Sequence, residues 1–226
     1  MSLDAWDDPS RLYLTRGEEV SPHRPFFTGD VVESVAIPGV QDEGAGIIVA
    51  HPCTMRRGPE LAESVLVAAV GPHDEVPAER WGRGYFDRMP LPVLRGEGRP
   101  FEAASLTKVG LVRAEELLAA DRIACLSEVG INMLQQRTVF NLTRLEVPTA
   151  EFWAAFAHTY EEADLLEEWV EAGADVGDAT VLTAATFETW LRADGRQESL
   201  RDPQQRASTR SEARREIAAR VAGIEQ

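Results

Sequence analysis

The sequence predicts an α+β protein, in which a small antiparallel β-sheet or barrel comes first and a helical part follows. Two observations favour this class. Short runs rich in valine, isoleucine and leucine, bounded by glycine or proline, occupy the first half of the chain. After Ser127 the apolar residues recur at helical spacing instead. A run of strands followed by a run of helices is typical of the α+β arrangement.

The predicted strands are short and are separated by turn residues. Their apolar residues either alternate with polar ones or run without interruption, as expected for half-buried and fully buried strands. Residues 71–100 carry many Gly, Pro and Arg residues, which predicts a long loop. A helical turn is expected at 113–122. The strands are expected at residues 29–37, 46–50, 64–70, 91–94 (within the long loop), 106–112 and 123–127.

The second half of the sequence predicts three helices with recognisable ends. Ser127 is a plausible N-cap for a helix that runs to about Thr143. Thr149 can cap the next helix, in which aromatic residues form an apolar stripe. The segment 183–195 predicts a helix that ends at its terminal glycine.

The last stretch of the chain, from residue 201, is rich in arginine. It places Ile217, Val221 and Ile224 on one face, which predicts an amphipathic helix with a narrow apolar stripe. The sequence leaves open whether residues 197–226 are ordered by themselves or fold only on binding. The polar, proline-bearing first 25 residues are expected to lack regular structure.

The charge of the chain limits its partners. The formal net charge of the 226 residues is −15, so wholesale electrostatic binding to nucleic acid or to an anionic membrane is disfavoured, whereas a local arginine patch could still bind. From residue 150 to residue 190 there are ten acidic residues and no lysine or arginine. This acidic region 150–190 is either a surface for a basic protein partner or the solvated face of an acidic protein.

Several common classes of protein lack support in the sequence. Cys53 and Cys125 form no C-x-x-C pair, so no zinc ribbon, redox motif or disulfide framework is indicated. No phosphate-binding glycine loop, H-E-x-x-H or G-x-S-x-G motif occurs, and no cofactor or metal is expected. The sequence shows neither an export signal nor an apolar run long enough to cross a bilayer. A cytoplasmic location without membrane contact is the simplest expectation.

The strongest site candidate is the stretch GAGIIVAHPCTMRRG, residues 44–58. A cysteine beside two arginines can have a lowered pKa and act as a nucleophile or sensor, with a nearby histidine as base. Guanidinium groups can bind a phosphate through two hydrogen bonds. The candidates are His51, Cys53 and Thr54 for catalysis and Arg56 and Arg57 for ligand or nucleic-acid binding.

A structural interpretation of the same stretch is favoured over the catalytic one. It treats the stretch as the end of a strand, where Cys53 packs as a small apolar residue and the arginines are solvated. On an extended chain His51 and Cys53 would share a face, unless Pro52 turns the chain.

A second candidate is the loop segment RWGRGYF, residues 80–86. Its alternation of cations and aromatic rings is typical of surfaces that hold single-stranded nucleic acid, with Arg80, Trp81 and Arg83 as contacts. The favoured alternative is that the aromatic residues anchor the loop to the core. His73 and Asp74 form a weaker candidate for acid–base chemistry or metal binding, because polar residues are normal in a turn after a strand.

The segments TGDVVESVAIPG, GIIVAHPCT, SVLVAAVGP and LTKVGLVRAEELLAADRIACLSEVGINMLQQRTV are similar in order and spacing to the PemK/MazF-like family of SH3-like barrels. Within the last, RIACLS resembles the family's Arg-Ile-Gly-x-Leu-Ser-like stretch. The resemblance covers residues 27–143 and implies an SH3-like β-barrel. The expected domains are a lead-in at 1–26, the barrel with a closing helix at 27–147 and a helical extension at 148–226.

The resemblance also bears on function, because the chain departs from the family at its catalytic positions. Family members that act as endoribonucleases have an arginine at the start of the second strand and a threonine or serine after the third. This chain has Gly44-Ala45-Gly46 and Ala69-Val70-Gly71 there. The resemblance therefore implies a non-catalytic binding module, possible as a homodimer and in a toxin–antitoxin-like or phage-defence setting. The alternatives are an endoribonuclease with a relocated site at Thr54, Arg56 and Arg57, and a Cys53-dependent enzyme.

Overall fold

The computed structural model describes residues 3–57, 60–177 and 180–224, which divide into two compact units. Unit 1 consists of residues up to Val20, Phe26–Arg57 and Leu61–Ala155. Unit 2 consists of Ser21–Pro25, Glu60 and the described residues from Phe156 onward.

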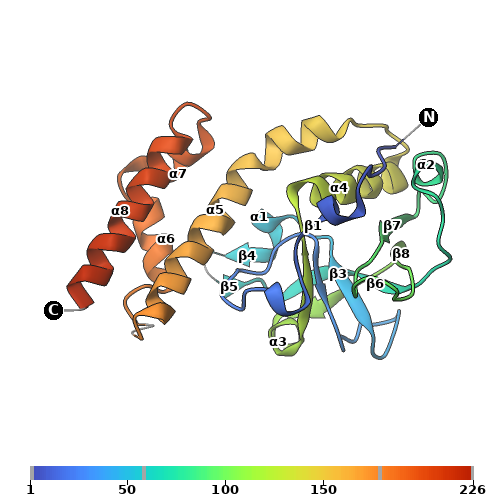
Figure 1. Ribbon diagram of the computed structural model, residues 1–226, viewed down its shortest axis with the longest axis horizontal. Helices are drawn as coiled ribbons and strands as arrows, with labels where there is room; N and C mark the ends of the chain where they lie inside the picture. Colours follow the sequence, from blue (N-terminus) through green and yellow to red (C-terminus); the bar gives the residue numbers. More distant parts are fainter. Residues whose placement is uncertain (1–2, 58–59, 178–179, 225–226) are drawn as a thin grey trace. The chain divides into compact units, whose positions relative to one another are not determined.

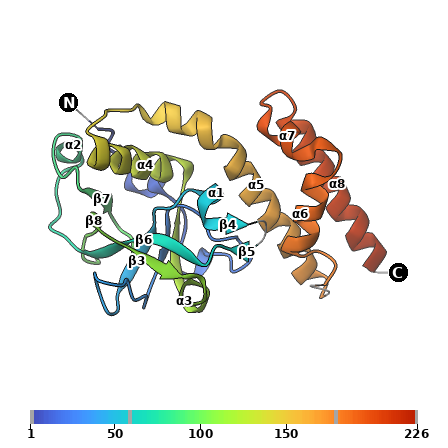
Figure 2. The same cartoon turned by 180° about the vertical axis from the view of Figure 1, so that it is seen from behind.

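Unit 1 is built on a seven-stranded antiparallel sheet that curls into a half-barrel, which confirms the α+β class (Figures 1 and 2). The strands are hydrogen-bonded in the order β1-β9-β2-β3-β6-β8-β7, so the last strand in the chain inserts between two early ones. The strands are β1 (Tyr13–Arg16), β2 (Asp30–Val32), β3 (Ala45–Ile48), β6 (Ser64–Pro72), β7 (Arg88–Leu91), β8 (Glu102–Arg113) and β9 (Arg122–Leu126). A separate two-stranded sheet pairs β4 (Arg56–Arg57) with β5 (Glu60–Leu61).

Two glycines allow the inner face of the curled sheet to pack tightly. A Cβ atom added to Gly46 in β3 would lie 2.6 Å from Val67 Cγ1, and one added to Gly110 in β8 would lie 2.7 Å from Ile37 Cγ2. Only glycine permits such approaches. A core cluster of buried residues contains Val32, Val35, Ile37, Ile48, Met55, Val65, Val67, Ala69, Val112 and Leu117.

The helices of unit 1 are mostly single turns, apart from α4. The short ones are η1 (Pro9–Leu12), η2 (Gly17–Glu19), α1 (Pro52–Met55), α2 (Ala78–Trp81) and α3 (Ala114–Ala119). Helix α4 spans Glu128–Thr143 and begins as predicted, because the Ser127 side chain accepts a hydrogen bond from the Gly130 amide. It ends at Arg144, which has a left-handed conformation.

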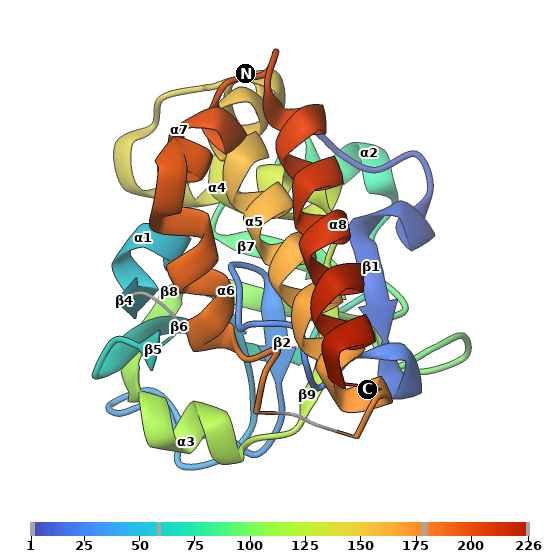
Figure 3. The same ribbon diagram turned by 90° about the vertical axis from the view of Figure 1, so that its left-hand side faces the viewer.

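Unit 2 is helical in its described residues. It contains the part of α5 (Thr149–Asp175) from Phe156 onward, α6 (Ala184–Arg192), η3 (Ala193–Gly195), α7 (Arg196–Arg201) and α8 (Arg206–Ile224). Figure 3 shows α8 running alongside α5. Their facing residues join a core built around Trp169, Phe187, Trp190, Leu191 and Leu200. Residues 197–224 are therefore helical apart from a short turn between α7 and α8.

The structure corrects several expectations about local elements. Residues 9–19, within the lead-in expected to lack regular structure, form η1, β1 and η2. The strand expected at 91–94 lies at Arg88–Leu91, and only the first part of 29–37 is a strand. The stretch from Pro52 to Met55, interpreted as the end of a strand, is one helical turn. No helix in the described part of the chain combines the length and apolar character that a membrane span requires.

Candidate functional site

The turn at residues 51–55 brings the three predicted catalytic candidates together. Pro52 occupies the first turn of α1, and its fixed φ favours a helical start over a continued strand. His51 precedes the helix, and its Nδ1 accepts a hydrogen bond from the Cys53 amide at 3.1 Å. The Thr54 hydroxyl donates to the His51 carbonyl oxygen at 2.7 Å. Both contacts stabilise the turn itself.

These contacts limit the chemistry that the turn can perform. The Nδ1 atom of His51 acts as a helix cap, so this nitrogen is not available to accept a proton from a substrate. Burial lowers the pKa of His51, which favours the neutral ring. The Cys53 side chain is exposed. The proposed base and nucleophile are thus neighbours in space, but they are linked through the Cys53 backbone amide.

The two arginines after this turn have different environments. The Arg56 guanidinium donates to the carbonyl oxygen of Phe26, through Nε at 3.1 Å and through a second, shorter contact. That bond ties the turn to the chain segment that precedes β2. Arg57, the last residue before the undescribed residues 58–59, is exposed. Of the two predicted phosphate ligands, Arg57 is the accessible one, and Arg56 braces the fold.

Trp81, predicted as a stacking surface for a base, is completely buried. Its ring lies 5.8 Å from that of Phe101 in a stacked arrangement, and its Nε1 donates to the Val76 carbonyl oxygen at 3.2 Å. Trp81 therefore anchors the loop, as the favoured interpretation of the sequence predicts. Arg80 and Arg83 on either side of it are exposed.

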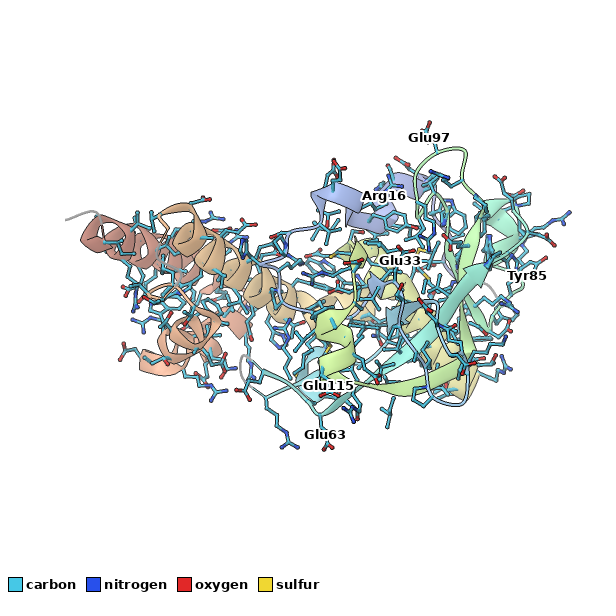
Figure 4. The ribbon with its side chains drawn as sticks, turned by 90° about the horizontal axis from the view of Figure 1, so that it is seen from below. Arg16, Glu33, Glu63, Tyr85, Glu97 and Glu115 are labelled. Atoms are coloured by element: carbon cyan, nitrogen blue, oxygen red, sulfur yellow. The ribbon has the colours of Figure 1, made fainter. Side chains whose placement is uncertain are left out.

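The exposed aromatic ring of this loop is Tyr85, which the sequence did not single out. Its side chain is 40% exposed, and its ring centroid lies 4.9 Å from that of Trp81. It also makes an edge contact with the ring of His73. The Nδ1 atom of His73 lies 2.7 Å from the Asp74 backbone carbonyl oxygen, so this contact is not an imidazole–carboxylate pair. Figure 4 shows Tyr85 projecting from the edge of unit 1.

A fully buried arginine in α4 holds this loop, and no sequence signal marked it. Arg137 donates to the carbonyl oxygens of Trp81 at 2.9 Å and Arg88 at 3.2 Å. Burial lowers its pKa to about 10, and no carboxylate of the described residues lies within ion-pair distance of it. Arg137 therefore joins α4 to the loop through neutral carbonyl groups.

Four acidic residues of α5 in unit 2 are paired with arginines of the same unit. Arg210 and Arg214 of α8 contact Glu161 at 3.1 Å and Glu168 at 2.7 Å. Arg24 contacts Asp164 at 2.8 Å and Glu167 at 2.5 Å. Part of the acidic region 150–190 is thus neutralised within the protein. Among the described residues, no group of three or more His, Cys, Asp and Glu side chains is arranged to hold a metal ion.

Together these features define the protein as an α+β protein with a curled antiparallel sheet, whose candidate site is a capped helical turn followed by an exposed arginine. Comparison with protein-family models gives no match, and comparison with curated proteins gives none either.

Proposed function

We propose that the chain is a PemK/MazF-like, SH3-like barrel that acts as a binding module and does not cleave RNA. One observation carries the proposal: the side chains of His51, Thr54 and Arg56 are engaged in the local fold. His51 caps α1, Thr54 donates back to His51, and Arg56 donates to Phe26. Phosphodiester cleavage needs a base, an acid and a cation at the phosphate. Here those groups support their own turn.

The surface best suited to binding is the loop that follows α2. Arg80 and Arg83 are exposed beside Tyr85, whose ring is partly exposed. Guanidinium groups and an accessible aromatic ring are the combination that holds single-stranded nucleic acid by charge and stacking. Arg137 fixes the base of this loop through the carbonyl oxygens of Trp81 and Arg88. We propose that this loop contacts single-stranded RNA in a toxin–antitoxin-like or phage-defence setting.

The first experiment is a cleavage assay on an end-labelled, mixed-sequence transcript. It compares the unmodified protein with the Arg56→Ala/Arg57→Ala variant and with Arg99→Ala, an exposed arginine of another loop. The proposal expects intact RNA with all three proteins. Discrete products that disappear only in the double variant would establish the alternative, an endoribonuclease with its site at Thr54, Arg56 and Arg57.

Binding of a labelled single-stranded RNA is measured by fluorescence anisotropy for the unmodified protein, Arg80→Ala/Arg83→Ala and Arg99→Ala. Replacing both Arg80 and Arg83 with alanine is expected to weaken binding about tenfold, because each exposed guanidinium contacts a phosphate. The Arg99→Ala control is expected to bind as the unmodified protein does. If Arg80→Ala/Arg83→Ala binds the RNA as tightly as the unmodified protein does, the assignment of RNA contact to this loop is contradicted.

A further inference from the structure

Unit 1 contains a cavity that is distinct from the turn at residues 51–57. It lies at the end of β1, between η2, the loop after β7 and strand β9. Its volume is about 600 Å³, within the range of small-molecule sites. Figure 4 labels Arg16, which lines it, and Glu97, on the loop that closes one side. The residues that give the cavity its chemistry are Arg16, Glu18, Glu19, Leu94, Arg95 and Ile123.

Arg16 is held in place before any ligand arrives. Its guanidinium lies 4.8 Å from the centroid of the Tyr13 ring and donates through one NH group to the carbonyl oxygen of Val93. The Tyr13 hydroxyl in turn donates to the Pro92 carbonyl oxygen at 2.8 Å. A guanidinium has five N–H donors in a planar fork, and one Arg16 nitrogen is used by the protein. The remaining N–H donors of Arg16 are the ones that we expect an anionic ligand to engage.

The second arginine of the cavity is compensated by acids. Arg95 donates through Nε to Glu102 at 3.0 Å and through NH1 to Glu33. Since two carboxylates share this guanidinium, Arg95 adds no net positive charge to the cavity. Arg16 is therefore the group that favours an anion.

The opposite charge in the cavity comes from Glu18 and Glu19 of η2. Both side chains are exposed, and neither has an ion-pair partner among the described residues. They disfavour a polyanion such as a nucleic-acid backbone, as does the net charge of −15. They favour a ligand that also carries a cationic group. Leu94 and Ile123 supply the apolar part of the lining.

We propose that this cavity binds a small zwitterion with an apolar body, of the size of a dipeptide. Its carboxylate binds Arg16, its ammonium group lies near Glu18 and Glu19, and its apolar side chains contact Leu94 and Ile123. This site goes beyond the proposed RNA contact, because none of the described residues that line it belongs to either loop of that proposal.

The test uses leucyl-leucine and two analogues that each lack one charge. N-acetyl-leucyl-leucine has no ammonium group, and leucyl-leucine amide has no carboxylate. Binding is followed by titration calorimetry and by shifts of backbone amide signals in NMR spectra. The variants are Arg16→Gln and Glu18→Gln/Glu19→Gln. The matched control is Arg113→Gln, an exposed arginine that does not line the cavity.

The dipeptide is expected to bind saturably and to shift signals of residues 16–19 and 94–96. Arg16→Gln is expected to weaken binding of leucyl-leucine about tenfold and to leave the affinity for leucyl-leucine amide unchanged. Glu18→Gln/Glu19→Gln is expected to weaken binding of leucyl-leucine but not of N-acetyl-leucyl-leucine. Absence of saturable binding, or equal affinity for all three compounds, would overturn the proposal. If Arg16→Gln does not fold, the Glu18→Gln/Glu19→Gln variant and the two analogues still test the proposed site.

Discussion

At the residue scale, His51 shows how one side chain can be both a plausible catalyst and a structural group. Its ring nitrogen accepts from the Cys53 amide at the start of α1. A side chain in this position contributes about 1 kcal/mol to stability when it caps a helix. The sequence pattern His-Pro-Cys-Thr admits both roles and favours the structural one, and the hydrogen bond from the Cys53 amide to the His51 ring supports that role.

The pH dependence of stability tests this role. Because burial lowers the pKa of His51, the unfolded chain binds the proton more readily than the folded chain. The contribution of His51 is therefore present above the ordinary histidine pKa of about 6.5 and is lost as the pH falls below it. His51→Asn keeps a capping acceptor that does not titrate.

Urea unfolding of both proteins at about pH 7.5 and about pH 5.5 measures this difference. The unmodified protein is expected to lose more stability on acidification than His51→Asn. A third variant, His51→Ala, is expected to be about 1 kcal/mol less stable at the higher pH because it loses the cap. Parallel pH profiles for the unmodified protein and His51→Asn would contradict the capping role.

The hydrogen bonds of the buried Arg137 are expected to contribute to stability. Arg137→Leu fills similar space but leaves the carbonyl oxygens of Trp81 and Arg88 without these donors. The free energy of unfolding is expected to fall by about 3 kcal/mol, because buried polar groups then lose their partners. Arg99→Leu, at an exposed loop position, is expected to change it by less than about 0.5 kcal/mol. Equal effects in urea unfolding would show that Arg137 does not hold the loop.

At the element scale, the close approach of β8 to Ile37 determines which residues the strand tolerates. A methyl group on Gly110 would lie 2.7 Å from Ile37 Cγ2 and 3.1 Å from the Pro38 carbonyl oxygen. Gly110→Ala is therefore expected to destabilise the protein by about 2 kcal/mol. Gly71 in β6 is a matched control, since a methyl group there meets no atom within 4 Å. If Gly110→Ala and Gly71→Ala unfold at the same temperature, the predicted clash of the added methyl group with Ile37 is contradicted.

The ion pairs between α5 and α8 are expected to limit local opening of α8. Removing both charges in Arg210→Gln/Arg214→Gln breaks the pairs with Glu161 and Glu168. Exposed pairs contribute up to about 1 kcal/mol each, so α8 should open more often, although unit 2 stays folded. Hydrogen exchange of α8 amides is expected to speed up several-fold. Arg215→Gln, on the same helix and without an ion pair among the described residues, is expected to leave the exchange unchanged.

Local patterns explain which elements the sequence could predict. Helix α4 was predictable because Ser127 caps it and its apolar spacing is regular, and strands β3, β6 and β9 were predictable from their apolar runs. The single turn α1 was not, because one proline turns an otherwise strand-like stretch. Strand β1 has its partner β9 more than a hundred residues away, so no local signal announces it. The burial of Arg137 was not predictable either, because its partners Trp81 and Arg88 lie 56 and 49 residues away in the sequence.

At the scale of the whole molecule, the net charge constrains RNA binding. With Arg57, Arg80 and Arg83 as the exposed arginines of the candidate loops, at most three phosphates are contacted. The slope of the logarithm of affinity against the logarithm of salt concentration is then expected to be no steeper than about −2 for single-stranded RNA. Anisotropy titrations at several salt concentrations measure it. A steeper slope would mean that a larger basic surface takes part.

The pairing of α5 with α8 has a consequence for any external partner of unit 2. Glu161 and Glu168 are already paired with Arg210 and Arg214, which belong to the same chain and lie a few tens of residues away in the sequence. This connection through the chain keeps the arginines at an effective concentration in the millimolar range. A basic protein that binds this acidic surface must therefore compete with Arg210 and Arg214, and its measured affinity is expected to be higher for the Arg210→Gln/Arg214→Gln variant than for the unmodified protein.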